Sequence, residues 1–374
     1  MGKKEINVNS IYTTTEYLSI LHSLEKQTNL ELDKKRIIGK GGYSQVYQAK
    51  SKGGKIFAAK IITIPKIEDK TNKKEIIKYE INKTIAQSDC FYATRAIHKA
   101  IIRAFQSYSL NKDSYAIVMQ KASASLNNII TQFYNGNVMP TAIMSKINLF
   151  NQMGEMLSKY FFNQIIPAMM YLKENNWVHF DIKPDNFLLC GNDLKLSDFG
   201  LCTNIKERSV NGKYHLSSIG TFSYLPPQYY NDGISIKEED AEKVDVFGLG
   251  CVLFRMLYYK FVIEKVQNDP KQYTQNDIAN KIANSILLSE SSKRSQSAKR
   301  AVAQMIEPNI NKRISMNEVF DLDWRFEGKK RIDEIAIINE DNYQKNIVEL
   351  QKLDYTIKPK IKKCKYKFKS IVGK

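Results

Sequence analysis

The sequence predicts an α+β fold, with β-strands in the first third of the chain and helices in most of the remainder. Between about residues 34 and 62, three β-rich segments are separated by a glycine cluster and a Lys-Gly-Gly turn, which indicates three successive antiparallel strands. A helix is expected at 73–86 and another strand at Tyr115–Met119. Beyond residue 123 the pattern is mostly helical, apart from a hairpin signal at 187–196.

The composition is that of a globular, basic protein. The chain has 374 residues and a formal net charge of +18, and 43 % of its residues are hydrophobic, which excludes a chain that is disordered throughout. The length fits two domain-sized units, or one two-lobed domain with extensions. The five cysteines form no C-x-x-C pair, which argues against a disulfide scaffold or a structural zinc site and favours a reducing compartment.

We expect an intracellular protein of the cytoplasm or nucleus without a transmembrane segment. The first 18 residues lack the apolar region of a secretory signal. The most apolar stretch, Val246–Ile263, contains Arg255 and Lys260 and is therefore predicted to be a buried core helix.

Two terminal extensions are predicted, at 1–33 and at 327–374. In the first, Thr13 and Glu16 form a capping-box pattern, and Tyr17, Leu21 and Leu24 then repeat at helical spacing, as in a helix that packs on a neighbouring surface.

The second extension has a further helix predicted around Ile347, and it ends in a basic segment. Residues 358–374 hold eight lysines and no acidic residue. Such a segment suits an anionic partner, either an acidic lipid, a nucleic acid or an acidic protein. A solvated tail without a specific partner remains the alternative.

The glycine cluster has the spacing of a phosphate-binding loop. Gly39, Gly41, Gly42 and Val46 nearly match G-x-G-x-x-G-x-V, with Ser44 at the third glycine position. A dinucleotide-binding turn must open a helix, whereas a strand follows here. A glycine-rich hairpin can lie over a polyphosphate because its backbone approaches the oxygens closely, although a simple tight turn is the alternative.

Lys60 is the candidate cation of this cleft. It lies in the third predicted strand beside the small residues Ala58 and Ala59, which leave room for its amine to reach inward. Glu80, on the following helix, is the expected partner, and Glu75 is its competitor. A lysine on a solvated strand face is the alternative.

The strongest signal is His179–Asn186, followed by Asp198-Phe199-Gly200. Phosphoryl transfer needs a carboxylate at the incoming hydroxyl, cations near the transferred group and oxygen ligands for Mg²⁺. Asp181 supplies the carboxylate and Lys183 a neighbouring cation. Asn186 and Asp198 are oxygen ligands suited to a hard metal.

These residues resemble the eukaryotic protein kinase superfamily, roughly from Lys34 to Trp324. The resemblance implies a bilobal protein-kinase-like fold, with a small antiparallel β-rich N-lobe at 34–122, a larger mainly helical C-lobe at 123–326, and ATP with Mg²⁺ between them. The catalytic residues it implies are Asp181, Lys183 and Asn186, and the metal ligands are Asn186 and Asp198. The ATP-binding residues it implies are Gly39, Gly41, Gly42, Val46, Ala58, Lys60, Glu80, Met119, Gln120 and Ala122. Among these, the resemblance implies an ion pair between Lys60 and Glu80. It also implies that Met119 is the gatekeeper and Gln120–Ala122 the hinge.

The resemblance also assigns supporting residues. Gly220–Gln228 resembles the end of the activation loop, Asp245 the buried aspartate that supports the catalytic loop, and Arg313 the arginine that anchors the Pro-Pro-Gln segment. Lys183 together with Gly220-Thr221 favours transfer to Ser or Thr hydroxyls of protein substrates. Short matches around the glycine loop and Pro226-Pro227 are closest to the monopolar-spindle, dual-specificity kinases.

Two rival functions are open. A pseudokinase would bind nucleotide or partners without phosphoryl transfer, but Lys60, Asp181, Asn186 and Asp198 are all present, which favours an active enzyme. Alternatively, the basic tail would direct the main function as a binding segment.

Two residues depart from the kinase pattern. Phe180 replaces the arginine that often grips an activation-loop phosphate, so we expect activity to depend less on phosphorylation at Ser217 or Ser218. Gln228 replaces a glutamate, so its hydrogen bond to Arg313 should lack charge assistance.

Overall fold

The computed structural model describes residues 14–134, 153–216, 219–230, 235–264, 273–290 and 292–326. The chain divides into two compact units, 1–327 and 328–374, and all described residues belong to the first. The predicted cap residue Thr13, the predicted helix around Ile347 and the basic segment 358–374 lie outside the described residues.

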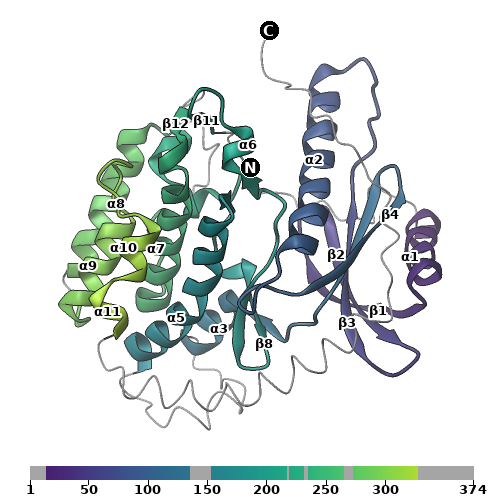
Figure 1. Ribbon diagram of the computed structural model, residues 1–374, viewed down its shortest axis with the longest axis horizontal. Coiled ribbons are helices and arrows are strands. Elements are labelled where there is room, and N and C mark those ends of the chain that lie inside the picture. Colours follow the sequence, from purple (N-terminus) through teal and green to yellow (C-terminus); the bar gives the residue numbers. More distant parts are fainter. Residues whose placement is uncertain are drawn as a thin grey trace. The chain divides into compact units, whose positions relative to one another are not determined.

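The N-lobe is built on one antiparallel sheet of five strands in the order β1-β2-β3-β5-β4 (Figure 1). The strands are β1 (Leu30–Lys40), β2 (Ser44–Ser51), β3 (Ile56–Thr63), β4 (Ala104–Asn111) and β5 (Ser114–Met119). The three predicted strands and the predicted Tyr115–Met119 strand are confirmed. β4 was not predicted, because half-buried polar residues interrupt its apolar pattern.

Side chains along each strand point alternately to the two faces of this sheet, and each face has its own core. On β3, Ala58 and Ile62 belong to the main core, whereas Ala59 and Ile61 belong to a second core on the opposite face. Helix α1 (Thr14–Thr28) covers this second face and contacts both β1 and β4 (Figure 1).

Helix α1 packs through one apolar stripe. Tyr17, Ile20, Leu21 and Leu24, at helical spacing, are at most 6 % exposed. The hydroxyls of Tyr17 and Tyr47 lie 3.4 Å apart, within this second core. The predicted stripe therefore packs on a neighbouring surface, as expected.

Helix α2 (Lys73–Arg95) crosses between the lobes beside β4 and β5. Asn72 caps it by accepting hydrogen bonds from two backbone N–H groups. The predicted end at residue 86 is wrong by nine residues. The helix continues because Ala86, Tyr92 and Ala93 are buried in the core, although polar neighbours obscure this pattern in the sequence.

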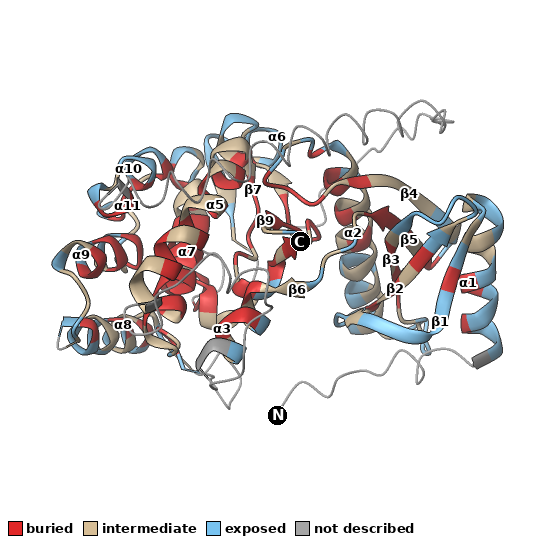
Figure 2. Cartoon of the chain, turned by 90° about the horizontal axis from the view of Figure 1, so that it is seen from below, coloured by how far each residue is buried: buried red, intermediate tan, exposed pale blue. Residues whose placement is uncertain are grey.

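The C-lobe is mainly helical, with α7 at its centre (Figure 2). Its helices are α3 (Leu126–Tyr134), α5 (Met153–Glu174), α6 (Ile205–Arg208), α7 (Glu242–Tyr258), α8 (Gln275–Glu290), α9 (Gln296–Met305), α10 (Met316–Phe320) and α11 (Asp323–Phe326). The core helix predicted at 246–263 is α7, which begins four residues earlier and ends five residues earlier than predicted. It ends at Tyr258 because Tyr259 adopts a left-handed conformation (φ 58°).

Short strands and 3₁₀ turns position the loops of the C-lobe. The predicted hairpin is β8 (Phe187–Cys190) and β9 (Asp193–Leu196), and β6 (Ala124–Ser125) pairs with β8. Four further short strands form two separate pairs: β10 (Thr203–Asn204) with β7 (Trp177–Val178), and β12 (Ser235–Lys237) with β11 (Lys213–His215). The 3₁₀ turns are Pro184–Asn186, Phe222–Tyr224, Pro227–Tyr230 and Glu238–Asp240.

Within the described part of the chain, no helix is long and apolar enough to span a bilayer.

Replacing Leu24 with Ala should destabilise the protein by about 2–5 kcal/mol, because it leaves a cavity where a fully buried side chain packs α1 on the sheet. Leu18→Ala, on the same helix but 46 % exposed, is the matched control and should change the unfolding free energy by less than about 0.5 kcal/mol. Urea unfolding of both variants measures this difference. Equal effects would contradict the assigned packing face.

Candidate active site

The loop 179–186 is fixed to the C-lobe core by one buried carboxylate. Asp245 of α7 accepts hydrogen bonds from the backbone N–H groups of His179 (2.7 Å) and Phe180 (2.8 Å). Burial raises the pKa of Asp245 to about 7, although the two N–H donors oppose this shift. Phe180 has φ +62°, a conformation that costs energy for a residue with a side chain, and Asp245 helps to hold it. The expected supporting role of Asp245 is confirmed.

Asp181 lies at the centre of a compact hydrogen-bond cluster. Its Oδ2 accepts from Lys183 Nζ at 2.6 Å and from Asn186 Nδ2 at 3.2 Å, and its Oδ1 accepts from the Thr221 hydroxyl at 2.8 Å. Lys183 also donates to Thr221 Oγ1 at 2.9 Å. The cluster brings together the three residues predicted to be catalytic. Thr221 is an additional member whose contact with Asp181 was not predicted.

Lys60 joins the two lobes through two ion pairs. Its ammonium lies 2.7 Å from Asp89 on α2 and 2.9 Å from Asp198 in the C-lobe. Burial alone would lower the pKa of Lys60, but the charges of Asp198 and Asp89 outweigh it and raise the pKa, so the amine stays protonated. We call Lys60, Asp89 and Asp198 the ion-pair cluster.

The predicted pairing of Lys60 with Glu80 is wrong, because the structure pairs Lys60 with Asp89. Glu80 precedes Asp89 by nine residues, or two and a half helical turns, and it is exposed on another face of α2. Glu75, the competitor, instead accepts hydrogen bonds from Asp69 and Asn72 at the start of the helix.

A signal for Asp89 was present in the sequence. It lies three residues after Ala86 and four before Ala93, in the stripe that faces the core. An acidic residue within an apolar stripe of a helix needs a buried partner. The sequence analysis considered only Glu80 and Glu75, whereas the phase of the helix favours Asp89.

Asp89 also contacts the Asp198-Phe199-Gly200 segment. Its Oδ1 accepts the backbone N–H of Phe199 at 2.9 Å, while its Oδ2 takes Lys60. Burial raises the pKa of Asp89, with a further contribution from Asp198, although Lys60 opposes it. The ion-pair cluster thus has two carboxylates for one ammonium, a net negative charge that favours a cation.

Asp198 has the exposure needed by a metal ligand. Burial opposes its ionisation, but the charges of Lys60 and Lys183 outweigh this and lower its pKa well below the usual range. Its side chain is 43 % exposed, whereas that of Asp89 is 5 % exposed. Asn186 donates its amide N–H to Asp181, so its amide oxygen is the atom suited to a metal.

Among the described residues, no group of three or more His, Cys, Asp or Glu side chains could hold a metal ion. One carboxylate and one amide oxygen nevertheless suit Mg²⁺, which keeps water ligands and takes others from substrate phosphates. The side chains present at Asp198 and Asn186 therefore fit a nucleotide-bound Mg²⁺ better than a metal held by protein alone.

Four of the predicted nucleotide-binding residues share the sheet face that carries Lys60. Val46 lies opposite Lys60 in the β2–β3 ladder, and Ala58 lies opposite Met119 in the β3–β5 ladder. Because side chains directly opposite in a ladder share a face, Val46, Ala58, Lys60 and Met119 lie together.

The glycine cluster forms the β1–β2 turn rather than the start of a helix. Gly41 N–H donates to Ser44 C=O at 2.8 Å, and a Cβ on Gly41 would approach the Ser44 hydroxyl to 2.6 Å. A side chain at position 41 would therefore require the Ser44 hydroxyl to move. Gly42 has open space around its missing Cβ, and Gly39 lies opposite Val46 in the ladder.

The predicted hinge follows β5. The Gln120 N–H donates to Arg103 C=O at 2.8 Å, and Ala122 packs against the main core. The Gln120 side-chain oxygen is buried and accepts no hydrogen bond in the described structure. The exposed Glu80 is the one predicted nucleotide-binding residue whose proposed contact the structure excludes.

Arg313 anchors the Pro-Pro-Gln segment, as expected. It is 2 % exposed and donates to Gln228 Oε1 at 3.2 Å and to the carbonyls of Glu307 and Lys243 at 2.8 and 2.9 Å. Burial lowers the pKa of Arg313 to about 9. Gln228 is neutral and cannot offset the cost of burying the Arg313 charge by forming an ion pair. Hydrogen bonds to three backbone carbonyls, those of Glu307, Lys243 and Pro308, offset it in part.

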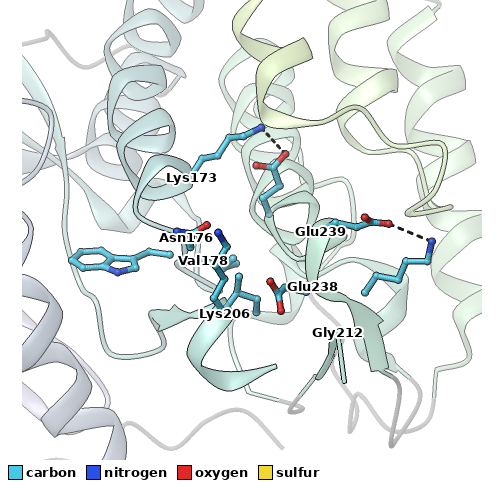
Figure 3. Close-up of a pocket in the computed structure, with 11 residues that line it drawn as sticks. Lys173, Asn176, Val178, Lys206, Gly212, Glu238 and Glu239 are labelled. Carbon is cyan, nitrogen blue, oxygen red and sulfur yellow. Dashed lines mark hydrogen bonds and ion pairs between the residues drawn. The ribbon is translucent and has the colours of Figure 1, made fainter. Parts of the chain in front are cut away.

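A separate pocket of about 600 Å³ lies in the C-lobe (Figure 3). It is bordered by Asn176 and Val178, by Lys206 and Gly212, and by Glu238, and none of the predicted site residues lines it. Two ion pairs, Lys173–Glu242 and Lys237–Glu239, occupy its rim. The pocket is therefore distinct from the cluster around Asp181.

Comparison with known proteins gives the same family. The protein kinase domain family matches residues 32–325. Similar curated proteins include CBL-interacting serine/threonine-protein kinase 20 of Arabidopsis thaliana, 26 % identical over 80 % of this chain and 59 % of that protein. Serine/threonine-protein kinase MPS1 of Saccharomyces cerevisiae is 25 % identical over 62 % of this chain and 28 % of its own length. Dual specificity protein kinase Ttk of Danio rerio is 33 % identical over 29 % of this chain and 11 % of its own length.

The chain thus spans less than two thirds of the length of these relatives. The family match extends over both lobes, from β1 to α11. With the bilobal fold and the cluster around Asp181, it establishes that this chain belongs to the eukaryotic protein kinase superfamily.

Proposed function

We propose that the chain is an active kinase that transfers the γ-phosphate of ATP to Ser or Thr hydroxyls of protein substrates. The observation that carries the proposal is the 2.9 Å contact between Lys60 and Asp198, which are 138 residues apart in the chain. The contact supports the proposal because Lys60 is the candidate phosphate-binding cation of the N-lobe and Asp198 the candidate metal ligand of the C-lobe.

The residues divide the work of phosphoryl transfer. Bound ATP with Mg²⁺ supplies the phosphoryl group and much of the charge that stabilises its transfer. Lys60 would bind and orient the phosphates, and Asp198 with the Asn186 amide oxygen would hold the metal. Asp181 would orient the substrate hydroxyl and accept its proton, while Lys183 offsets negative charge beside it.

The acceptor class is inferred from the neighbours of Asp181. The Thr221 hydroxyl donates to Asp181 and accepts from Lys183, so an aliphatic hydroxyl fits beside this carboxylate. The serine/threonine kinases among the relatives support this acceptor, and Ttk, named as dual specificity, keeps tyrosine transfer open. Nucleotide binding without transfer is the rival, and the intact set of charged residues favours transfer.

Asp181→Asn should lower turnover by about 10²- to 10⁴-fold, because the variant cannot accept the proton of the substrate hydroxyl. Radiolabelled ATP, Mg²⁺ and a degenerate peptide library containing Ser, Thr or Tyr measure both activity and acceptor class. Asp185→Asn, an exposed carboxylate in the same loop, is the control and should keep activity within a few-fold. Equal activity of wild type and Asp181→Asn would contradict the assignment of Asp181.

Asp89→Asn should reduce kcat/KM for ATP by about 10- to 100-fold, because it removes a charged hydrogen-bond partner of Lys60. Glu80→Gln removes the exposed carboxylate from the same helix and is expected to leave these kinetics unchanged. Steady-state kinetics at varied ATP compare the two variants. A loss confined to Glu80→Gln would instead support Glu80 as the functional partner of Lys60.

Asp198→Asn should abolish the Mg²⁺ dependence of nucleotide binding, since it removes the only carboxylate of the proposed metal site. The loss of metal affinity should exceed the roughly 10- to 100-fold expected for a residue that merely supports a ligand. Fluorescent ATP-analogue binding with and without EDTA provides the measurement. Mg²⁺-dependent phosphoryl transfer that persisted in this variant would contradict the metal assignment.

A further inference from the structure

The β1–β2 turn (41–43), which we call the glycine turn, leads into a strand with two functional faces. Helix α1 covers the face of the sheet that lies away from α2 (Figures 1 and 2). On β2, Val46 lies opposite Lys60 and shares its face, whereas the two chain neighbours of Val46, Gln45 and Tyr47, lie on the face that α1 covers. Residues that face the nucleotide site and residues that face α1 therefore alternate along β2.

Gln45 is a polar residue buried on the α1 face. It is 4 % exposed, and its Oε1 accepts a hydrogen bond from the Tyr47 hydroxyl at 2.5 Å. The hydroxyl of Tyr17, on α1, lies 3.4 Å from that of Tyr47. Burial raises the pKa of both phenols, so each stays protonated. Because 3.4 Å is long for a hydrogen bond between hydroxyls, Tyr17 contributes mainly by keeping water away from the Tyr47–Gln45 bond.

Gln45 also belongs to the backbone that closes the glycine turn. It directly follows Ser44, whose C=O accepts the Gly41 N–H at 2.8 Å. Tyr43 C=O, in the turn itself, accepts the Thr63 N–H of β3 at 2.9 Å. Glycine backbone has many accessible conformations, so the position of the turn depends on the residues that flank it. A shift of Gln45 would therefore move the turn.

Helix α1 is attached to the chain on both sides of β2. Glu16 accepts a hydrogen bond from Lys66, three residues after β3, at 2.8 Å, and Glu25 accepts the Leu32 N–H of β1 at 3.0 Å. The Lys66–Glu16 pair is exposed and contributes little stability. The buried contacts of α1, among them that of Tyr17, therefore provide most of the constraint on the sheet.

We propose that α1 is a positioning element of the nucleotide site, and that Tyr17 and Tyr47 are its positioning residues. They hold Gln45, and with it the glycine turn, in place beside the strand of Lys60 before ATP binds. Such preorganisation raises affinity because less chain has to be ordered on binding. Helix α1 ends before residue 32, so this constraint comes from a segment that the family match does not include. The inference rests on the nucleotide use proposed above and adds what sets the affinity of that site.

The first test measures ATP affinity in the full chain. Tyr47→Phe leaves the buried Gln45 Oε1 without its donor, so the dissociation constant for ATP with Mg²⁺ should rise by about two- to tenfold, the range for one hydrogen bond. Tyr17→Ala admits water to the same bond and should have an effect of similar size. Leu18→Ala, 46 % exposed on the same helix, is the matched control and should bind ATP like wild type. Titration with a fluorescent ATP analogue gives these constants, and wild-type affinity in either tyrosine variant would overturn the proposal.

The second test separates positioning from general stability. Ile282, on α8 of the C-lobe, is fully buried. Ile282→Ala should therefore lower the thermal unfolding temperature, yet its affinity for ATP below that temperature should equal that of wild type. If Ile282→Ala weakened ATP binding as much as Tyr17→Ala does, affinity would follow overall stability and the proposal would be wrong.

The third test does not depend on phosphoryl transfer. Hydrogen–deuterium exchange of peptides covering 39–47, measured without nucleotide, should be faster in Tyr47→Phe and Tyr17→Ala than in wild type or Leu18→Ala. Equal exchange in all four proteins would refute the constraint on the glycine turn. Faster exchange and weaker ATP binding in a protein that phosphorylates no peptide would support the role of α1 while refuting the proposed kinase activity.

Discussion

The site depends on one ammonium group held between two carboxylates. Lys60 comes from the N-lobe sheet, Asp89 from α2 and Asp198 from the C-lobe, so the position of each element is constrained by the other two. A buried ion pair of this kind is costly to desolvate and is a poor source of stability. Its value is geometric, because a shift of α2 or of the C-lobe loop leaves a charge without its partner.

The sequence predicted the contiguous parts of the site and missed what depends on helix phase or tertiary pairing. Asp181, Lys183 and Asn186 lie within six residues, so a local motif was enough to group them. Asp89 was missed because choosing among three acidic residues required the buried face of α2. Thr221 was missed as a partner because it reaches Asp181 from 40 residues away.

The fold follows the same division. Strands with clear alternation, such as β3 and β5, were predicted within about one residue, whereas β4 was not predicted because its partner strand stabilises a largely half-buried sequence. Helix ends were the weakest part. The extension of α2 to Arg95 and the end of α7 at Tyr258 are set by core contacts and by one left-handed residue, which local composition does not reveal.

Helix α1 lies before residue 32, where the family match begins, yet its buried stripe packs on residues that flank Lys60. Ala59 and Ile61, the two chain neighbours of Lys60, point to this helix from the opposite side of β3. An expression fragment cut at the family limit would therefore present a bare apolar sheet surface to solvent and invite self-association. The folded kinase domain of this protein therefore extends beyond the limit of the family match, because its second core includes α1.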